Sequence, residues 1–336
     1  MKKIRRIVSI LLAALMVFAM IGCSGSSTGN TEDAESSGEE EKLEIVATLQ
    51  SQQINFWSNV QHTMERLASE NNVDLTIMDI NGDVSTLQKV VDDIVVLKPD
   101  GVILCGLEKS TLTTHVKTLQ DAGIPVVTYN LQPDQEICPT VVTDHYELGH
   151  VAGVAAAEYW QENHGGDTPI GGAIDLYSAP DCAERVRGFL EGFQTVFSDF
   201  EIVQTVDGAG TRSTSLTAAA DMLQAHPEIN VIFGINADSA LGGLDALNEL
   251  GRGTSDQTLV ASVDGTETDC AELKDPESAL KAVAGNSPRI MSETAWDILM
   301  KALDGEIDPY AFYSENMEIV SVTPETADEW VSGNFE

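Results

Sequence analysis

From residue 43 almost to its end, the chain alternates short runs rich in β-branched residues with stretches patterned as helices. The runs predicted to be strands are 43–49, 73–80, 101–105, 125–129, 140–143, 170–176, 202–206, 231–235, 259–263 and 279–284. The helices predicted between them are 56–71, 84–97, 111–122, 146–163, 183–196, 213–225, 240–250 and 289–303. Strands separated by crossover helices pair in parallel. The pattern therefore predicts an α/β fold of two doubly wound parallel-sheet lobes, each sheet covered by helices.

The first 22 residues have the composition of a targeting segment. Lys2, Lys3, Arg5 and Arg6 precede the apolar run 7–21, which ends at Gly22-Cys23. This order resembles the bacterial lipoprotein signal, although Met20 stands where that signal usually has Leu. The resemblance implies that residues 1–22 are a signal peptide and that Cys23 becomes the lipidated first residue. The alternative is an uncleaved N-terminal helix, and both place the remaining chain outside the cytoplasmic membrane, with the lipidated form held on the outer face of the bacterial cell membrane.

Charge excludes one class of partner. Eighteen Lys and Arg residues against 54 Asp and Glu residues give a formal net charge of −36, which would repel a nucleic-acid backbone. Residues 23–42 carry much acid and no apolar periodicity, so they are predicted to form a disordered tether. Such a spacer would hold an acidic fold away from an anionic membrane surface. The acidity is equally explained as a general property of the source organism's proteins.

No motif indicates a cofactor, a metal or catalysis. Four cysteines remain after Cys23, widely and irregularly spaced, which is compatible with free thiols or with one incidental bridge: Cys105, Cys138, Cys182 and Cys270. No pair among the six histidines has metal-ligand spacing, so all six are predicted to be surface residues. The segment 79–90 lacks the glycine and the final acid of a calcium loop, and 208–213 lacks the third glycine of a dinucleotide-binding turn. We expect no cofactor, no metal and no catalytic residues.

Polar and aromatic residues follow several of the predicted strands. They are Phe56 and Trp57 after the first strand, Asn130 after the fourth, Asp181 and Arg185 at a helix start, and Asn236 and Asp264 after two later strands. In parallel sheets, ligands bind beyond the carboxyl ends of the strands. Aromatic rings cover the C–H faces of a sugar, carboxylates accept hydrogen bonds from hydroxyls, Arg donates and Asn does both. This set favours a neutral, polyhydroxylated ligand.

Taken together, these segments resemble the type I periplasmic binding proteins, in the ribose- and galactose-binding branch that serves sugar ABC importers. The resemblance covers about residues 43–320 and rests on segments 55–57, 98–103, 122–127, 185–189, 236–242 and 263–266. It implies that the ligand contacts are Phe56, Trp57, Asn130, Asp181, Arg185, Asn236, Asp264 and, after a one-residue slip, Asn286. Ribose binders have Asp-Arg where this chain has Asn130-Leu131, and the aromatic that many members carry near residue 209 is absent. The identity of the sugar is therefore not transferable.

Each of these residues also has a purely structural interpretation. Phe56 and Trp57 could both be core residues, and Asp181 could simply cap its helix. Arg185 could pair with a neighbouring acid on the surface. Asn236 and Asp264 could serve only as turn residues.

The resemblance further implies that the chain crosses between the lobes near 144–145, 285–286 and 314–317. The N-terminal lobe would comprise 43–145 and 286–315, and the C-terminal lobe 146–285 and 316–336. The predicted function is a monomeric solute-binding lipoprotein that captures a monosaccharide or related polyol by hinge closure and delivers it to ABC permease subunits. The alternatives are a sensor lipoprotein that presents a sugar or furanosyl signal to a membrane receptor, and an exported hydrolase. An anionic ligand is disfavoured by the surrounding acids.

Overall fold

The computed structural model describes residues 42–335. The predicted signal peptide, Cys23, the tether up to residue 41 and the last residue of the chain lie outside the described residues. Within 42–335, none of the helices has the length and apolarity needed to cross a membrane.

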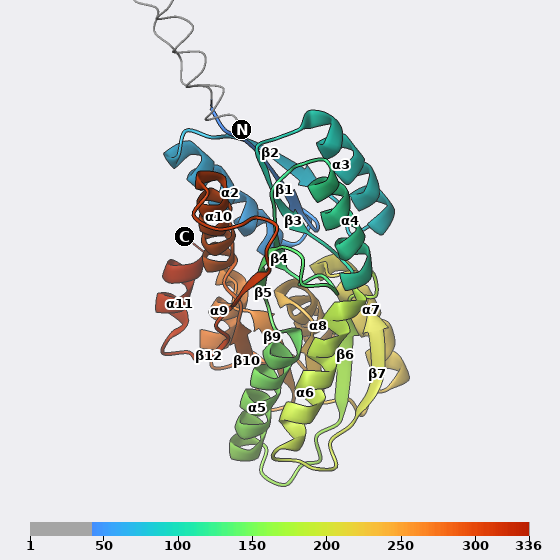
Figure 1. Ribbon diagram of the computed structural model, residues 1–336. Coiled ribbons are helices and arrows are strands. Elements are labelled where there is room, and N and C mark those ends of the chain that lie inside the picture. The colour runs from blue at the N-terminus through green and yellow to red at the C-terminus, as the bar shows by residue number, and fades with distance from the viewer. Residues whose placement is uncertain (1–41, 336) are drawn as a thin grey trace, which may run out of the picture. The chain divides into compact units, whose positions relative to one another are not determined.

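The first sheet has six strands, all parallel, in the order β11-β5-β4-β3-β1-β2. These are β1 (Glu44–Leu49), β2 (Asp74–Asp79), β3 (Gly101–Cys105), β4 (Val126–Asn130), β5 (Pro139–Val142) and β11 (Tyr313–Asn316). Apolar residues of α2 (Asn55–Glu70) and α10 (Pro288–Asp304) pack on one face, and those of α3 (Val84–Leu97) and α4 (Lys109–Asp121) on the other. We call this sheet and its helices the first lobe (Figure 1).

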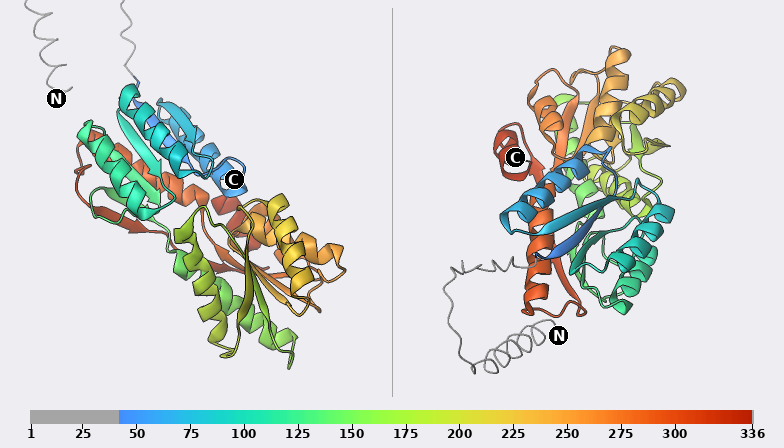
Figure 2. Two further views of the ribbon diagram at one scale, coloured as in Figure 1. Left: turned by 90° about the vertical axis from the view of Figure 1, so that its right-hand side faces the viewer. Right: turned by 90° about the horizontal axis from the view of Figure 1, so that it is seen from above.

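The second sheet also has six strands, in the order β12-β10-β9-β8-β6-β7. They are β6 (Gly171–Asp175), β7 (Ile202–Asp207), β8 (Val231–Gly234), β9 (Leu259–Asp264), β10 (Leu280–Gly285) and β12 (Val320–Val322). On one face lie α5 (His145–Asn163) and α6 (Glu184–Gln194), which run side by side (Figure 2). On the other lie α7 (Arg212–Ala225), α8 (Ala237–Glu249), α9 (Glu267–Lys274) and α11 (Ala327–Asn334). This is the second lobe.

The predicted fold class is confirmed: every strand and helix expected from the alternating pattern is present, with ends shifted by a few residues. Within residues 42–335, five elements were not predicted, namely the 3₁₀ turn Pro180–Ala183, α9, β11, β12 and α11. β11 is an exposed edge strand with the polar sequence YSEN. It therefore has no run of apolar residues from which a strand could be predicted. One expectation was wrong in detail, because the second sheet is not wholly parallel: β12 pairs antiparallel with β10.

The chain passes between the two sheets at three places. It leaves β5 for α5 at residues 143–144, leaves β10 for α10 at 286–287, and leaves β11 for β12 at 317–319. In each case the connecting segment follows a strand directly, so the passages lie close to the carboxyl ends of β5, β10 and β11. The polar residues that follow the strands are therefore near the junction of the two lobes.

Candidate functional site

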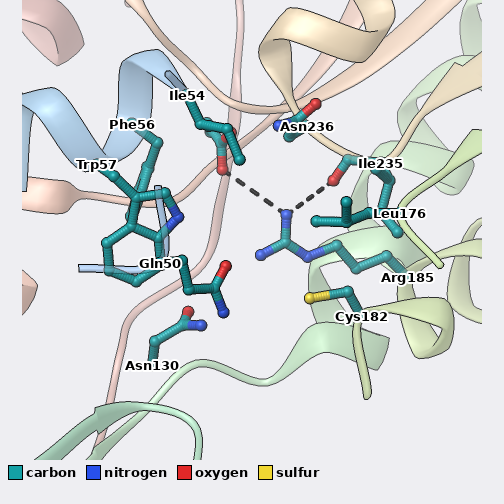
Figure 3. A pocket seen from close by; sticks show the side chains of 11 residues that line it. Gln50, Ile54, Phe56, Trp57, Asn130, Leu176, Cys182, Arg185, Ile235 and Asn236 are labelled. Carbon is teal, nitrogen blue, oxygen red and sulfur yellow. Dashed lines mark hydrogen bonds and ion pairs between the residues drawn. The ribbon is translucent and has the colours of Figure 1, made fainter. Parts of the chain in front are cut away.

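A small cavity lies between the lobes, lined by residues that follow strands of both sheets (Figure 3). The first lobe contributes Gln50, Ile54, Phe56, Trp57 and Asn130, and the second contributes Leu176, Cys182, Arg185, Ile235, Asn236 and Asp264. Six of the eight residues predicted to contact a ligand are among them. The cavity measures about 30 Å³, which is room for one or two water molecules. A larger molecule could enter only if the lobes moved apart.

The two aromatic residues at the start of α2 are buried and also reach the cavity. Phe56 and Trp57 are each 4% exposed, and their rings meet edge to face with centroids 5.4 Å apart. Trp57 makes a second edge-to-face contact with Tyr129 of β4, at 5.8 Å. Both rings also belong to the apolar core between α2 and the sheet. Phe56 and Trp57 can therefore serve both as core residues and as an apolar wall of the cavity.

Two polar lining residues have unusual backbone conformations. Asn130 ends β4 with φ +67° and Asp264 ends β9 with φ +88°. Positive φ is costly for residues other than glycine, although Asn and Asp tolerate it best. Each bend turns the side chain at the carboxyl end of its strand, and strain of this kind is concentrated at functional sites. Both residues are almost fully buried.

Arg185 is the only positively charged residue in the lining of this cavity. Its Nη1 donates a hydrogen bond to the Ile235 carbonyl at 2.7 Å, and its Nε donates to His145 Nδ1 at 3.1 Å. The helix that carries it packs unusually close to α5. A Cβ on Gly149 of α5 would lie 1.9 Å from the Arg185 carbonyl oxygen, and one on Gly188 of α6 would lie 2.0 Å from the Tyr146 carbonyl oxygen. Glycine at these positions brings the two helices together and so places Arg185 at the cavity.

Asp264 faces Arg185 across the cavity. Burial raises the pKa of its carboxyl group, and the Arg185 guanidinium acts against that rise. The Arg185 Nη1 and Asp264 Oδ1 atoms are 3.9 Å apart, beyond the hydrogen-bond range of about 2.7–3.2 Å. The opposite charges of Arg185 and Asp264 cancel, but the two groups make no direct hydrogen bond. Each can therefore still form a hydrogen bond with a third group. A hydroxyl fits this arrangement, because it can accept from the guanidinium and donate to the carboxylate.

The side chain of Asn236 already makes two hydrogen bonds within the second lobe. Its Oδ1 caps α8 by accepting from the Ser239 N–H at 2.8 Å, and its Nδ2 donates to the Gly210 carbonyl at 3.0 Å. The turn interpretation therefore holds together with its place in the lining. One lone pair and one N–H remain for another partner.

The other two predicted contacts lie outside this lining. Asp181 belongs to the 3₁₀ turn before α6 and lines a neighbouring cavity, where its carboxylate accepts from the Lys109 backbone N–H at 3.1 Å. Asn286 follows β10 and is 1% exposed. It lowers the pKa of Asp264, but neither its Oδ1 nor its Nδ2 has a hydrogen bond of normal geometry within residues 42–335.

Sequence reasoning missed one polar residue of the cavity lining, Gln50. Gln50 follows β1, is buried and lines the cavity, with Nε2 donating to the Gly106 carbonyl at 3.1 Å. Its place directly after the first strand was the signal that could have found it. The expectation that all histidines lie on the surface was wrong: His115 of α4 and His145 at the start of α5 are buried.

Thiols and metal ligands do not form a site in the described part of the chain. Cys105, Cys138, Cys182 and Cys270 are all buried and free. Burial raises the pKa of each thiol, which keeps it protonated and unreactive near neutral pH. No group of three or more His, Cys, Asp or Glu residues between 42 and 335 is placed to hold a metal ion.

Residues 45–307 match the family model described as a periplasmic binding protein domain. The chain belongs to this family. The resemblance to its type I members of the ribose and galactose branch is thereby confirmed. The family consists of extracytoplasmic binding proteins, so the expectation that the chain is not an enzyme also holds, and the hydrolase alternative is set aside.

Known relatives cover nearly the whole chain. The ribose import binding protein of Bacillus subtilis is 25% identical over 304 residues, which span 90% of this chain and 94% of the relative. An ABC transporter periplasmic-binding protein of Escherichia coli is 23% identical over 82% of this chain and 85% of its own length. The crystal structure of a galactofuranose binding protein superposes with a TM-score of 0.77 at 20% identity, covering 87% of this chain and 98% of that one. This last likeness shows the shared fold.

Proposed function

We propose that the protein captures a neutral monosaccharide or related polyol between its lobes and delivers it to an ABC importer. The observation that carries the proposal is the Arg185 and Asp264 pair. Its charges cancel, and its 3.9 Å separation leaves room for a hydroxyl to bridge the two groups. Gln50, Asn130 and Asn236 surround the pair with donors and acceptors, and the rings of Phe56 and Trp57 provide an apolar wall.

The charge balance argues against an anionic ligand. A carboxylate or phosphate would meet Arg185 but also Asp264. Two further acids interact electrostatically with this pair, the buried Asp175 and the half-buried Asp238. A neutral molecule with several hydroxyls avoids that repulsion. The named ligands of relatives agree in class: one relative is a ribose import binding protein and another is a xylitol-binding protein.

We propose a hinge-closure mechanism. The lobes comprise residues 43–145 with 286–315 and residues 146–285 with 316–336. This division is supported by the packing of α10 in the core of the first lobe and by the pairing of β11 with the first sheet and of β12 with the second. A ligand that contacts both lobes binds the closed form better than the open form and so shifts the equilibrium toward closure. The closed monomer then presents a single surface to the permease subunits.

We further propose that Cys23 carries a lipid and that the acidic segment up to residue 42 is a tether to the outer face of the cell membrane. Gly22-Cys23 behind a basic and apolar leader supports this. A Cys23→Ser variant should incorporate no labelled fatty acid and should leave the membrane fraction, whereas the wild-type chain should remain there. Equal labelling of the two proteins would refute the anchor and leave the sugar site unaffected.

The test of the sugar site is a binding screen with one matched pair of variants. Residues 43–336 should be stabilised against heat by one or a few neutral pentoses, hexoses or polyols that are recovered unchanged. Asp264→Asn should weaken that binding by about tenfold or more, because a charged acceptor is lost from the buried pair. Asp245→Asn, which breaks an ion pair with Arg212 elsewhere in the second lobe, should leave binding unchanged. A folded protein that binds no member of the panel would overturn the proposal.

A further inference from the structure

Arg185 is held by one side chain that lies outside the lining of the cavity. That side chain is His145, the first residue of α5, three residues after β5 ends at Val142. Its Nδ1 accepts from Arg185 Nε at 3.1 Å, while the Ile235 carbonyl accepts from Nη1 at 2.7 Å. The guanidinium is thus fixed at two of its three nitrogens, one of them by a residue at the passage between the lobes.

The contact determines the state of the imidazole ring. All N–H groups of Arg are donors, so His145 Nδ1 must be the unprotonated acceptor, which leaves the hydrogen on Nε2. Burial lowers the pKa of His145, and the charges of Arg185 and Lys109 lower it further. The ring is therefore neutral at physiological pH, in one tautomer. Its Nε2 is buried without a hydrogen-bond partner among residues 42–335.

We propose that His145 is a positioning residue for the sugar site: its neutral ring holds the Arg185 guanidinium in the orientation that leaves Nη2 and one Nη1 hydrogen for the ligand. This rests on the proposed function. Arg185 has a nearby alternative, since Asp264 Oδ1 is only 3.9 Å from Nη1. Without the His145 acceptor, rotation of the guanidinium toward Asp264 would form a direct ion pair and close the gap that a bridging hydroxyl occupies.

The charged groups around His145 set the expected effect of pH. Arg185 on α6 and Lys109 on α4 are its cationic neighbours. Their own partners are Asp264 and Asp181, and Asp144 caps the helix that His145 begins. Protonation of the ring would remove the acceptor and place a third positive charge beside two others. We therefore expect sugar affinity to fall when the pH drops well below 6.5, the ordinary value for His.

The conservative replacement is asparagine. Nδ1 of His and Oδ1 of Asn are both bonded to Cγ, so the amide oxygen can accept from Arg185 Nε at nearly the same place, but it does not titrate. Alanine removes the acceptor. His226→Asn is the matched control, because His226 follows α7 and contacts Glu228 in a part of the second lobe away from the cavity.

The experiment measures binding of the panel sugars, D-ribose and D-allose included, by titration calorimetry from pH 4.5 to 8, with thermal unfolding to confirm folding. His145→Ala should bind at least about tenfold more weakly, and His145→Asn should recover most of the affinity. Wild type should lose affinity at low pH more steeply than His145→Asn, in which the acids titrate but the ring does not. His226→Asn should match wild type throughout.

Two results would refute the inference separately from the function. Wild-type affinity in a folded His145→Ala variant would show that the ring does not position Arg185. Equal weakness of the Asn and Ala variants, with parallel pH profiles for wild type and His145→Asn, would show that only the packing of the ring matters. If wild type itself binds none of the sugars, the proposed function fails and this inference fails with it.

Discussion

Replacement of Asp238 should weaken sugar binding even though this side chain is not in the cavity lining. Asp238 lies in the first turn of α8, and its carboxylate accepts from the backbone N–H of Asn55 at 3.0 Å. Asn55 is the first residue of α2, in the other lobe. The N-cap residue of α2, Ile54, has no side-chain cap of its own. The second lobe therefore supplies the cap that this helix of the first lobe lacks.

The same arrangement occurs at α4. This helix also begins without a side-chain cap from its own N-cap residue, Glu108, and its first N–H donates to Asp181 of the second lobe at 3.1 Å. Lys109 Nζ adds a weaker ion pair to the same carboxylate at 3.9 Å. Both contacts join the lobes, so both are lost when the lobes separate. Each one consequently favours closure.

The magnitude follows from known capping energies. Loss of a capping side chain costs about 1 kcal/mol, which is about a fivefold change in an equilibrium constant. If the ligand-free protein is mostly open, a closed state destabilised by this amount raises the dissociation constant about fivefold. Asp238→Ala and Asp181→Ala remove contacts at different helices, so the double variant should show roughly additive losses.

The assay pairs calorimetry with small-angle scattering of the ligand-free protein. Glu249→Ala is the control, because it removes an exposed acid at the far end of α8 and so changes net charge equally. The Asp238 variant should bind the sugar more weakly, and the ligand-free protein should be at least as extended as wild type. An unchanged dissociation constant together with an unchanged scattering profile would refute the argument that these carboxylates hold the lobes closed.

Three further outcomes are expected. Gly149→Ala would place a Cβ 1.9 Å from the Arg185 carbonyl oxygen and push α6 away from α5, so it should lower both the melting temperature and sugar affinity; unchanged values would show that the helices tolerate separation. Burial raises the pKa of Asp269 to about 7, so the folded state holds the proton more tightly than the unfolded chain and the free energy of unfolding should decrease as pH rises from about 4 to 7. In Asp269→Asn, denaturant titrations at several pH values should show a smaller decrease of the free energy of unfolding between about pH 4 and about pH 7 than in wild type. The same decrease in both proteins would contradict this expectation. Trp330→Phe removes a hydrogen bond of 2.8 Å to the Gly265 carbonyl, so denaturant titration should show a free energy of unfolding lower by about 1 kcal/mol. An unchanged free energy of unfolding would show that water replaces the ring N–H as the donor.

Local sequence pattern was sufficient for the fold and for part of the site. The alternation of β-branched runs and amphipathic helices predicted both sheets, because backbone preference and burial of one face act over a few residues at a time. Position after a strand was enough to select Asn130, Asn236 and Asp264, since parallel strands bring their carboxyl ends to one edge. The structure brings these residues to a single cavity. That they contact a sugar remains a prediction.

Packing between distant segments decided the rest. Asp181 is near Arg185 in sequence, but the 3₁₀ turn directs it to α4 instead of the cavity lining. His145 has no local partner in the sequence, and its acceptor role exists only because glycines let α5 and α6 approach closely. Gln50 is one of three neighbouring glutamines, with Gln52 and Gln53, and only the fold shows that Gln50 is the one that lines the cavity. The sequence by itself thus determined which elements form and which strand ends carry polar groups. Which of those groups meet, and at what distance, depended on long-range packing that no local pattern encodes.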